Sequence, residues 1–232
     1  MKRIAGMATM PGREVQRQQA IKSLVGQVDE LWIYCIGFDP EPMPPGVRCI
    51  VGREDRGDAG KFDAIFAAEP DPGTLAFTVD DDLIYPRNYA KQLVWQFKRL
   101  KARLGRVAVG IHAARFRESP PRNYRGHRDV RHCLHEAKGV RSEHMLGTGT
   151  LLFEVGSLQL SAGDFENGIM ADVWFALAAQ RQALPLRSLP HKGPWLTAAQ
   201  PMPEDTLWQR MRRDGDSVQV AALGRIEQWR LW

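Results

Sequence analysis

The chain has 232 residues, of which 44% are hydrophobic and 25% charged, which is ordinary for a soluble globular protein. Its 32 Lys and Arg against 27 Asp and Glu give a net charge of +5, an excess too small to indicate nucleic-acid binding by itself. The three cysteines include no CxxC pair, which argues against a disulfide framework. The start, MKRIAGMATMPGR, lacks the apolar core of a signal peptide, and no apolar run is long enough for a membrane span. We therefore expect a cytoplasmic protein, either free or held at the inner face of the membrane by a partner.

Short apolar segments alternate with helical patterns along most of the chain. The predicted strands cover residues 3–7, 31–36, 47–51, 74–79, 106–111 and 145–153, with a further short strand in 186–195. The predicted helices cover residues 14–25, 64–68, 87–104 and 169–184. The first strand, helix and strand fall within about forty residues, which is the length of a βαβ unit and predicts a parallel sheet.

Two regions differ in composition from this alternation. Residues 113–142 are polar and contain seven arginines, so we expect an irregular loop that is either simply solvated or suited to an anionic ligand, since Arg grips carboxylates bidentately. From Pro201 the chain is rich in Arg and Trp, and we expect one helix through Leu207, Trp208 and Met211 and a second over 218–232. The predicted organisation is one α/β domain over 1–200 and a helical extension over 201–232, packed on or beside the core.

Three consecutive acids end the predicted strand 74–79. Its apolar residues indicate a strand buried on both faces, and Asp80, Asp81 and Asp82 follow at once. In an extended chain Asp80 and Asp82 share a face, and two hard oxygen ligands there suit Mn²⁺ or Mg²⁺ holding phosphate oxygens. The alternative is an exposed acidic turn, but the mutual repulsion of three carboxylates favours a bound cation.

Other polar loops follow or precede predicted strands. Residues 7–13 (MATMPGR) follow the first strand, 58–62 (DAGKF) the third, and 146–150 (LGTGT) open a later one. Because ligands bind beyond the carboxyl ends of strands in open α/β sheets, these loops are expected to converge with the three acids.

This ordered set of motifs resembles the GT-A fold glycosyltransferases, whose D-x-D motif binds the metal of a nucleotide sugar. It is most similar to the α-N-acetylglucosaminyltransferase family of bacterial heparosan-type capsule synthesis. The similarity rests on PGR and QVD, on DAGKF and DDDLIYP, and on VGIH, LGTGT, DVWF and a late WL. The resemblance spans about residues 4–196, is weak in 113–142, and implies a GT-A (Rossmann-like) mixed, mostly parallel sheet flanked by helices.

The resemblance also implies roles for individual residues. Asp80 and Asp82 would hold Mn²⁺ or Mg²⁺ against the diphosphate, and Asp81 would orient the ribose or the donor sugar. The residues expected to bind the UDP-sugar are Met10, Pro11, Arg13, Asp58, Lys61, Asp80, Gly147, Thr148, Gly149 and Lys192. His191 is expected as a third metal ligand. Alternatives stay open: Asp58 and Lys61 could be a surface ion pair, and the two glycines could mark a bulged edge strand.

Asp172 lies near the start of the predicted helix 169–184. It could simply favour the positive end of the helix dipole, or face the acceptor hydroxyl. If the enzyme inverts, Asp172 is the expected general base; if it retains, as the resembled family does, Asp172 would bind the sugar. His132-Cys133-Leu134-His135 suggests zinc, but no second ligand pair follows at zinc-finger spacing, so we do not predict a zinc site from the sequence.

The predicted function is a metal-dependent glycosyltransferase that moves a sugar, with N-acetylglucosamine as the first choice, from a UDP-sugar to a glycan acceptor in bacterial surface polysaccharide synthesis. The acceptor would be an oligo- or polysaccharide, with an anionic one favoured by the Arg-rich segment, and other glycan-synthesis proteins are expected as partners. The alternatives are a sugar-phosphate nucleotidyltransferase and a non-catalytic module that binds anionic polysaccharide. The first would need a Gly-rich loop after the first strand, where the chain instead has MATMPGR.

Overall fold

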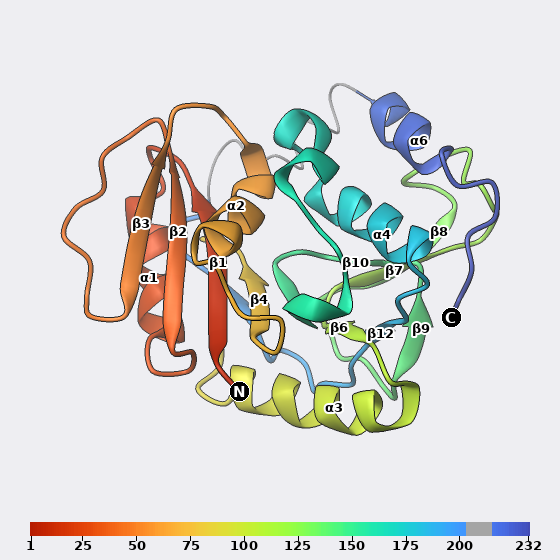
Figure 1. The fold of residues 1–232 in the computed structure, drawn as a ribbon, viewed down its shortest axis with the longest axis horizontal. Coiled ribbons are helices and arrows are strands. Elements are labelled where there is room, and N and C mark those ends of the chain that lie inside the picture. The colour runs from red at the N-terminus through yellow and green to blue at the C-terminus, as the bar shows by residue number, and fades with distance from the viewer. Residues whose placement is uncertain (203–214) are drawn as a thin grey trace.

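The computed structural model describes residues 1–202 and 215–232, and its centre is an eight-stranded mixed sheet (Figure 1). The strands, in spatial order, are β3 (Val47–Gly52), β2 (Glu30–Ile36), β1 (Arg3–Thr9), β4 (Leu75–Val79), β11 (Thr150–Glu154), β6 (Ala108–Gly110), β12 (Leu186–Ser188) and β9 (Arg141–Glu143). All of them run in one direction except β11 and β9, which pair antiparallel with their neighbours. The predicted mostly parallel sheet is therefore confirmed.

Helices cover both faces of this sheet. They are α1 (Glu14–Leu24), α2 (Gly60–Ala67), α3 (Tyr89–Leu104), α4 (Ala171–Arg181) and α6 (Ser217–Leu223). One buried cluster joins the sheet to α2, α4 and α6, and a second joins it to α1 and α3. Side chains that alternate along a strand supply both clusters, because successive Cβ atoms point to opposite faces: Leu151 and Phe153 belong to the first and Leu152 to the second.

The strand β4 has all five residues buried, as expected for a strand covered on both faces. It lies between β1 and β11, with Met7 paired to Val79 on one side and Thr150 paired to Val79 on the other. The three acids therefore leave the sheet at its centre.

The predicted continuous strand 145–153 is wrong. The structure divides it into β10 (Met145–Leu146) and β11, with a turn between them in which the Thr150 amide donates to the Gly147 carbonyl at 3.1 Å. The alternative of a bulged edge strand is wrong too, because β11 lies between β4 and β6. The apolar pattern is continuous, but the glycines let the chain turn against its neighbours.

The segment 113–142 is more regular than predicted. It contains β7 (Ala113–Phe116) and β8 (Arg128–Arg131), which pair antiparallel and form a three-stranded sheet with β10, and it leads into β9. Phe116 and Tyr124 are buried and anchor this segment to the core. Strands of three or four residues are too short for a period-2 pattern to stand out among the arginines.

The remaining elements are short. β5 (Leu83–Ile84) pairs with β13 (Thr197–Ala198), and single 3₁₀ turns occupy Gly57–Ala59, Val155–Ser157, Ala162–Asp164 and Glu166–Gly168. Regular helix in the C-terminal part ends at Leu223, not at 232 as predicted, and the predicted helix through residues 207–211 lies outside the described residues.

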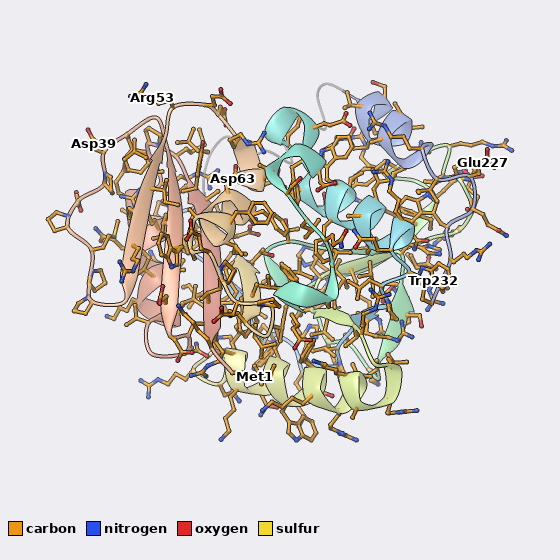
Figure 2. All side chains as sticks on the ribbon, in the orientation of Figure 1. Met1, Asp39, Arg53, Asp63, Glu227 and Trp232 are labelled. Atoms are coloured by element: carbon orange, nitrogen blue, oxygen red, sulfur yellow. The ribbon has the colours of Figure 1, made fainter. Side chains whose placement is uncertain are left out.

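The C-terminal residues return to the sheet. Trp229 is buried against Phe116, with ring centroids 5.1 Å apart, and its indole N–H donates to the Leu223 carbonyl at 3.1 Å. Arg187 of β12 donates to the Trp232 carbonyl at 2.6 Å. Trp232 lies on the side of the molecule opposite to Asp39 (Figure 2). Within the described part of the chain, no helix has the length and apolar character to cross a membrane.

Candidate active site at the carboxyl end of the sheet

The polar residues selected from the sequence gather at one edge of the sheet. The strands β1, β4, β6 and β12 are parallel, so the segments that follow them leave at the same edge, and antiparallel β11 begins there. The segments brought to this edge are residues 10–13, 80–82, 111–112, 147–149 and 189–191. The topology therefore brings the loops after β1 and β4 and before β11 to one edge, as predicted.

Asp80 is held by a buried lysine. Lys61, on α2, is 3% exposed and its ammonium donates to Asp80 Oδ1. Burial alone would lower the pKa of Lys61, but the charges of Asp80 and Asp58 oppose it, and the pKa is raised. Lys61 is therefore a buried, charged residue that contacts the first of the three acids. The alternative of a surface ion pair with Asp58 is wrong, because both Lys61 and the Asp58 Oδ1 atom are buried.

Asp81 is tied to the neighbouring strand. The Thr9 hydroxyl, at the end of β1, donates to Asp81 Oδ2 at 2.7 Å. Burial raises the pKa of Asp81, and the Thr9 hydrogen bond and the charge of Arg13 oppose that rise. β4 ends at Val79 and residues 81–82 form a turn, so the three acids are sorted by their partners and not by the alternation of an extended strand.

Asp82 faces Arg13, whose Nη1 lies 3.6 Å from Asp82 Oδ2. Burial, followed by the charges of Asp80 and Asp81, raises the pKa of Asp82 to about 6, although Arg13 and Lys61 act against the rise. A bound divalent cation would remove this repulsion and favour the ionised carboxylates.

The glycine turn leaves room for the acid and for an imidazole. A Cβ added at Gly149 would lie 1.9 Å from Asp80 Oδ2, and one added at Gly147 would lie 2.8 Å from His112 Cδ2. The Thr150 hydroxyl accepts hydrogen bonds from the backbone amides of Ile111 and His112. Thr150 is thus occupied with the backbone, which leaves the buried Thr148 as the hydroxyl that could meet a ligand. The donor set and the glycine cradle around Asp80 fit a hard divalent cation.

Asp58 holds the start of α4. Its Oδ2 accepts from the Ala171 amide at 2.9 Å, and its Oδ1 has no hydrogen-bond partner among the described residues. Burial raises the pKa of Asp58 to about 7, with the charges of Asp172 and Asp80 adding to the rise and Lys61 opposing it. The positive end of the α4 helix dipole stabilises the carboxylate, so Asp58 links the site to α4.

Asp172 lies in the first turn of α4. Its Oδ1 accepts from the Val173 amide at 2.9 Å and its Oδ2 from the Tyr124 hydroxyl at 3.2 Å. Burial raises the pKa of Asp172, and the charge of Arg128 is the largest opposing effect. The Arg128 guanidinium lies 4.0 Å from the centre of the Tyr124 ring. Both residues belong to the segment 113–142, which was predicted as an irregular loop.

Four of the predicted site residues have weaker support from the structure. His191 is 9% exposed, and its Nε2 is buried without a partner in the described part of the chain. It does not join two of the acids in a group of ligand atoms within 4.8 Å of one another; the described residues that form such a group are His112, His132 and Cys133. Lys192 is exposed, as is Pro11, while Met10 is partly buried. Their roles stay predictions.

Sequence reasoning missed Thr9, Tyr124 and Arg128. Thr9 lies inside the loop that was selected after the first strand, but its hydroxyl gave no signal of its own. Tyr124 and Arg128 are 48 and 44 residues from Asp172 in the chain, and only the fold brings Tyr124 to it. The nearby Arg-rich composition was the one sequence signal for this pair.

Comparison with known proteins supports the fold. No protein-family profile and no curated protein matches the sequence. The structure of S. aureus TarS residues 1–349 is similar, with 14% identity, 87% of this chain covered and a TM-score of 0.51. This chain spans 61% of that TarS chain. At this identity the similarity shows the fold alone, and it agrees with the predicted α/β class.

Two further solved structures have lower TM-scores. A 4-diphosphocytidyl-2C-methyl-D-erythritol synthase shares 18% identity, covers 87% of this chain and 95% of its own, and has a TM-score of 0.48. A CMP:2-keto-3-deoxy-manno-octonic acid synthetase complexed with CTP shares 10% identity, covers 97% and 100%, and has a TM-score of 0.47. These similarities do not confirm the capsule-synthesis family that the motifs resemble, so that assignment stays a prediction.

Proposed function

We propose that this protein is a metal-dependent glycosyltransferase that transfers a sugar from a UDP-sugar to a glycan acceptor. The observation that carries the proposal is the arrangement of Asp80 and Asp82 at the end of the buried central strand β4. Asp80 is supported by Lys61 from below and fits into the space left by Gly149. Such a carboxylate pair at the carboxyl end of a sheet suits a cation that also holds phosphate oxygens.

In this proposal Asp80 and Asp82 hold Mn²⁺ or Mg²⁺. When bound, the ion would act as a Lewis acid and neutralise charge on the departing diphosphate. Lys61 orients Asp80 through its ammonium, and Thr9 orients Asp81 through one hydrogen bond. Arg13 lies beside Asp82, where a guanidinium fork can also meet phosphate oxygens.

Asp172 is the proposed residue on the acceptor side. Its carboxylate is oriented by Tyr124 and by its own helix. The raised pKa brings the group nearer to neutral pH, which favours proton transfer if the enzyme inverts. If the enzyme retains, the same carboxylate would bind the transferred sugar, for which N-acetylglucosamine is the first choice.

The ion pairs of the Arg-rich segment bear on the proposed anionic acceptor. Four of the arginines in the segment 113–142 already face an acid within 4.0 Å: Arg117, Arg122, Arg125 and Arg141. An anionic glycan would have to compete with these carboxylates. Arg141 pairs with the buried Glu143, but the other three are surface pairs, which contribute about 0–1 kcal/mol each. Exchange of these three acids for a carboxylated polymer is therefore feasible. A peripheral location at the inner membrane face remains part of the proposal.

The test is donor hydrolysis and transfer. The protein is incubated with Mn²⁺ and UDP-N-acetylglucosamine, UDP-glucuronate or UDP-glucose, and UDP release is measured. We expect release from at least one donor and loss of it in Asp82→Asn. Asp129→Asn is the matched control, because Asp129 is an exposed acid paired with Arg117.

Three outcomes would overturn the proposal. Full UDP release in Asp82→Asn with EDTA present would exclude the metal role. Pyrophosphate release from a nucleoside triphosphate and a sugar phosphate would favour the nucleotidyltransferase instead. Binding of heparin-like polymer, with no shift in melting temperature on adding UDP and Mn²⁺, would favour a non-catalytic polysaccharide-binding module.

A further inference from the structure

A second group of ligand atoms lies near the three acids. His112, His132 and Cys133 each offer one ligand atom, and these atoms lie within 4.8 Å of one another. None of the three takes part in the proposed reaction. We propose that they form a binding site for one zinc ion, distinct from the hard-cation site of Asp80 and Asp82.

The fold brings the three ligands together from two segments. His112 follows β6, and His132 and Cys133 follow β8, 20 and 21 residues later in the chain. The rings of His112 and His132 have centroids 5.0 Å apart and planes at 76°. The sequence alone offered only His132-Cys133-Leu134-His135, which lacks a second ligand pair; the missing partner is His112.

The position of His112 is fixed by its surroundings. Its backbone amide donates to the Thr150 hydroxyl at 2.9 Å, and its carbonyl accepts from the Gly147 amide at 2.9 Å. The absent side chain of Gly147 provides the space that the imidazole occupies, since a Cβ there would lie 2.8 Å from His112 Cδ2. A rigid ligand with its backbone fixed on both sides loses little freedom when it binds an ion.

The spacing of the three ligand atoms is close to that in a zinc-bound site. Zn–N bonds of about 2.0 Å and Zn–S bonds of about 2.3 Å place tetrahedral ligand atoms about 3.5 Å apart. The ligand atoms here lie within 4.8 Å of one another, so they need to approach by at most about 1.3 Å. Side-chain rotation can supply this, because His132 is exposed.

The ligand types select the metal. Two imidazoles and a thiolate are borderline to soft donors, which favour Zn²⁺ over Mg²⁺ or Mn²⁺. The cysteine is buried and the exposed imidazole faces solvent, so the fourth position is open to water. The ring of exposed His135 lies 5.1 Å from that of His132, centroid to centroid, and makes His135 a candidate for that position. Three protein ligands with an open position are typical of reactive zinc sites.

The alternative interpretation is that the three side chains only pack against one another and bind no ion. Cys133 belongs to the hydrophobic core with Tyr89 and Leu189, and a buried cysteine commonly behaves as a small apolar residue. Packing explains Cys133 alone. It does not explain why a ligand atom of the exposed His132 and one of the fixed His112 both lie within 4.8 Å of the thiol sulfur.

The experiment is a titration of chelator-treated, reduced protein with Co²⁺, a spectroscopic substitute for Zn²⁺. We expect one equivalent of Co²⁺ to give a thiolate-to-cobalt charge-transfer band, and one equivalent of Zn²⁺ to abolish it. Cys133→Ser should lose the band, and His132→Ala should bind Co²⁺ at least about tenfold more weakly. His132 is exposed, so that variant tests the site even if Cys133→Ser fails to fold.

Controls separate this site from the proposed function. Cys49→Ser, a cysteine outside the cluster, should keep the band, and so should Asp82→Asn while it loses UDP release. Absence of a charge-transfer band in folded wild-type protein would overturn the zinc site. A band that persists unchanged in both Cys133→Ser and His132→Ala would overturn the assignment of the ligands.

Discussion

The buried lysine beneath the acids offers the sharpest test of the electrostatic arrangement. Replacing Lys61 by Met keeps an unbranched side chain, one atom shorter, and removes its charge. The change leaves Asp80 without its partner and Asp58 without the charge that most opposes its raised pKa. Removing one partner of a buried ion pair costs about 3–5 kcal/mol, and because the Asp80 side chain is 37% exposed, we expect about 3 kcal/mol or slightly less at alkaline pH.

The loss should depend on pH. The pKa of Asp58 is raised from 3.8 to about 7, so the stability this group contributes is complete below 3.8 and is lost as the pH rises through about 7. Below about pH 6 Asp58 is protonated in the folded protein and has no need of a lysine. Above about pH 8 it is ionised, and Lys61→Met removes the charge that most opposes the effect of its burial, which leaves the Ala171 amide hydrogen bond to stabilise the carboxylate. The destabilisation should therefore be at least about 1 kcal/mol larger at the alkaline end.

The assay is urea unfolding followed by circular dichroism at about pH 5.5 and about pH 8.5. Lys101→Met is the matched control, because Lys101 pairs with Glu154 at 2.5 Å with its own side chain 37% exposed, and surface pairs contribute less than about 1 kcal/mol. Equal losses at both pH values, or a loss no larger than that of Lys101→Met, would refute the reasoning.

Three further predictions concern single side chains. Gly149→Ala should displace the Asp80 carboxylate and weaken Mn²⁺ binding about 10–100-fold, measured by calorimetric titration, whereas Gly73→Ala, which meets no atom within 4 Å, should not. Asp58→Asn should flatten the fall in melting temperature between about pH 4 and pH 7, because the group with the raised pKa is removed. Phe62→Ala should cost about 3–5 kcal/mol in urea unfolding, since its ring is fully buried and stacks on Phe165 at 4.3 Å.

Each of these has a contrary result. Unchanged Mn²⁺ affinity in Gly149→Ala would show that the acid does not need the space beside it. A pH profile of Asp58→Asn that matches the wild type would assign the dependence to another group, such as Asp82. A loss under about 1 kcal/mol in Phe62→Ala would mean that the cluster around α2 relaxes to fill the cavity.

The long, strongly patterned elements could be predicted from the sequence. The helix expected at 87–104 is α3 (Tyr89–Leu104), and the βαβ spacing led correctly to parallel β1 and β2. The failures occur where tertiary contacts override a local pattern. The apolar run 145–153 is interrupted because Gly147 and Gly149 must pass close to His112 and Asp80, and nothing within the run itself reveals those neighbours.

The candidate site could be predicted in position more than in detail. The three acids located the site, because they are consecutive in the sequence and directly follow a buried strand. Lys61 was expected to bind the UDP-sugar, but its partner in the structure is Asp80. The Thr9 and Tyr124 hydroxyls could not be found, since they meet Asp81 and Asp172 across 72 and 48 residues of chain.

The antiparallel strand β11 has a consequence for synthesis on the ribosome. β4 is complete at Val79, but the partner that covers its second edge, β11, ends only at Glu154. During the translation of the intervening residues β4 is an exposed edge of a largely apolar sheet, which is a template for pairing with other chains. Slow translation or codon changes between these two strands should therefore lower the soluble yield more than equal changes after residue 154.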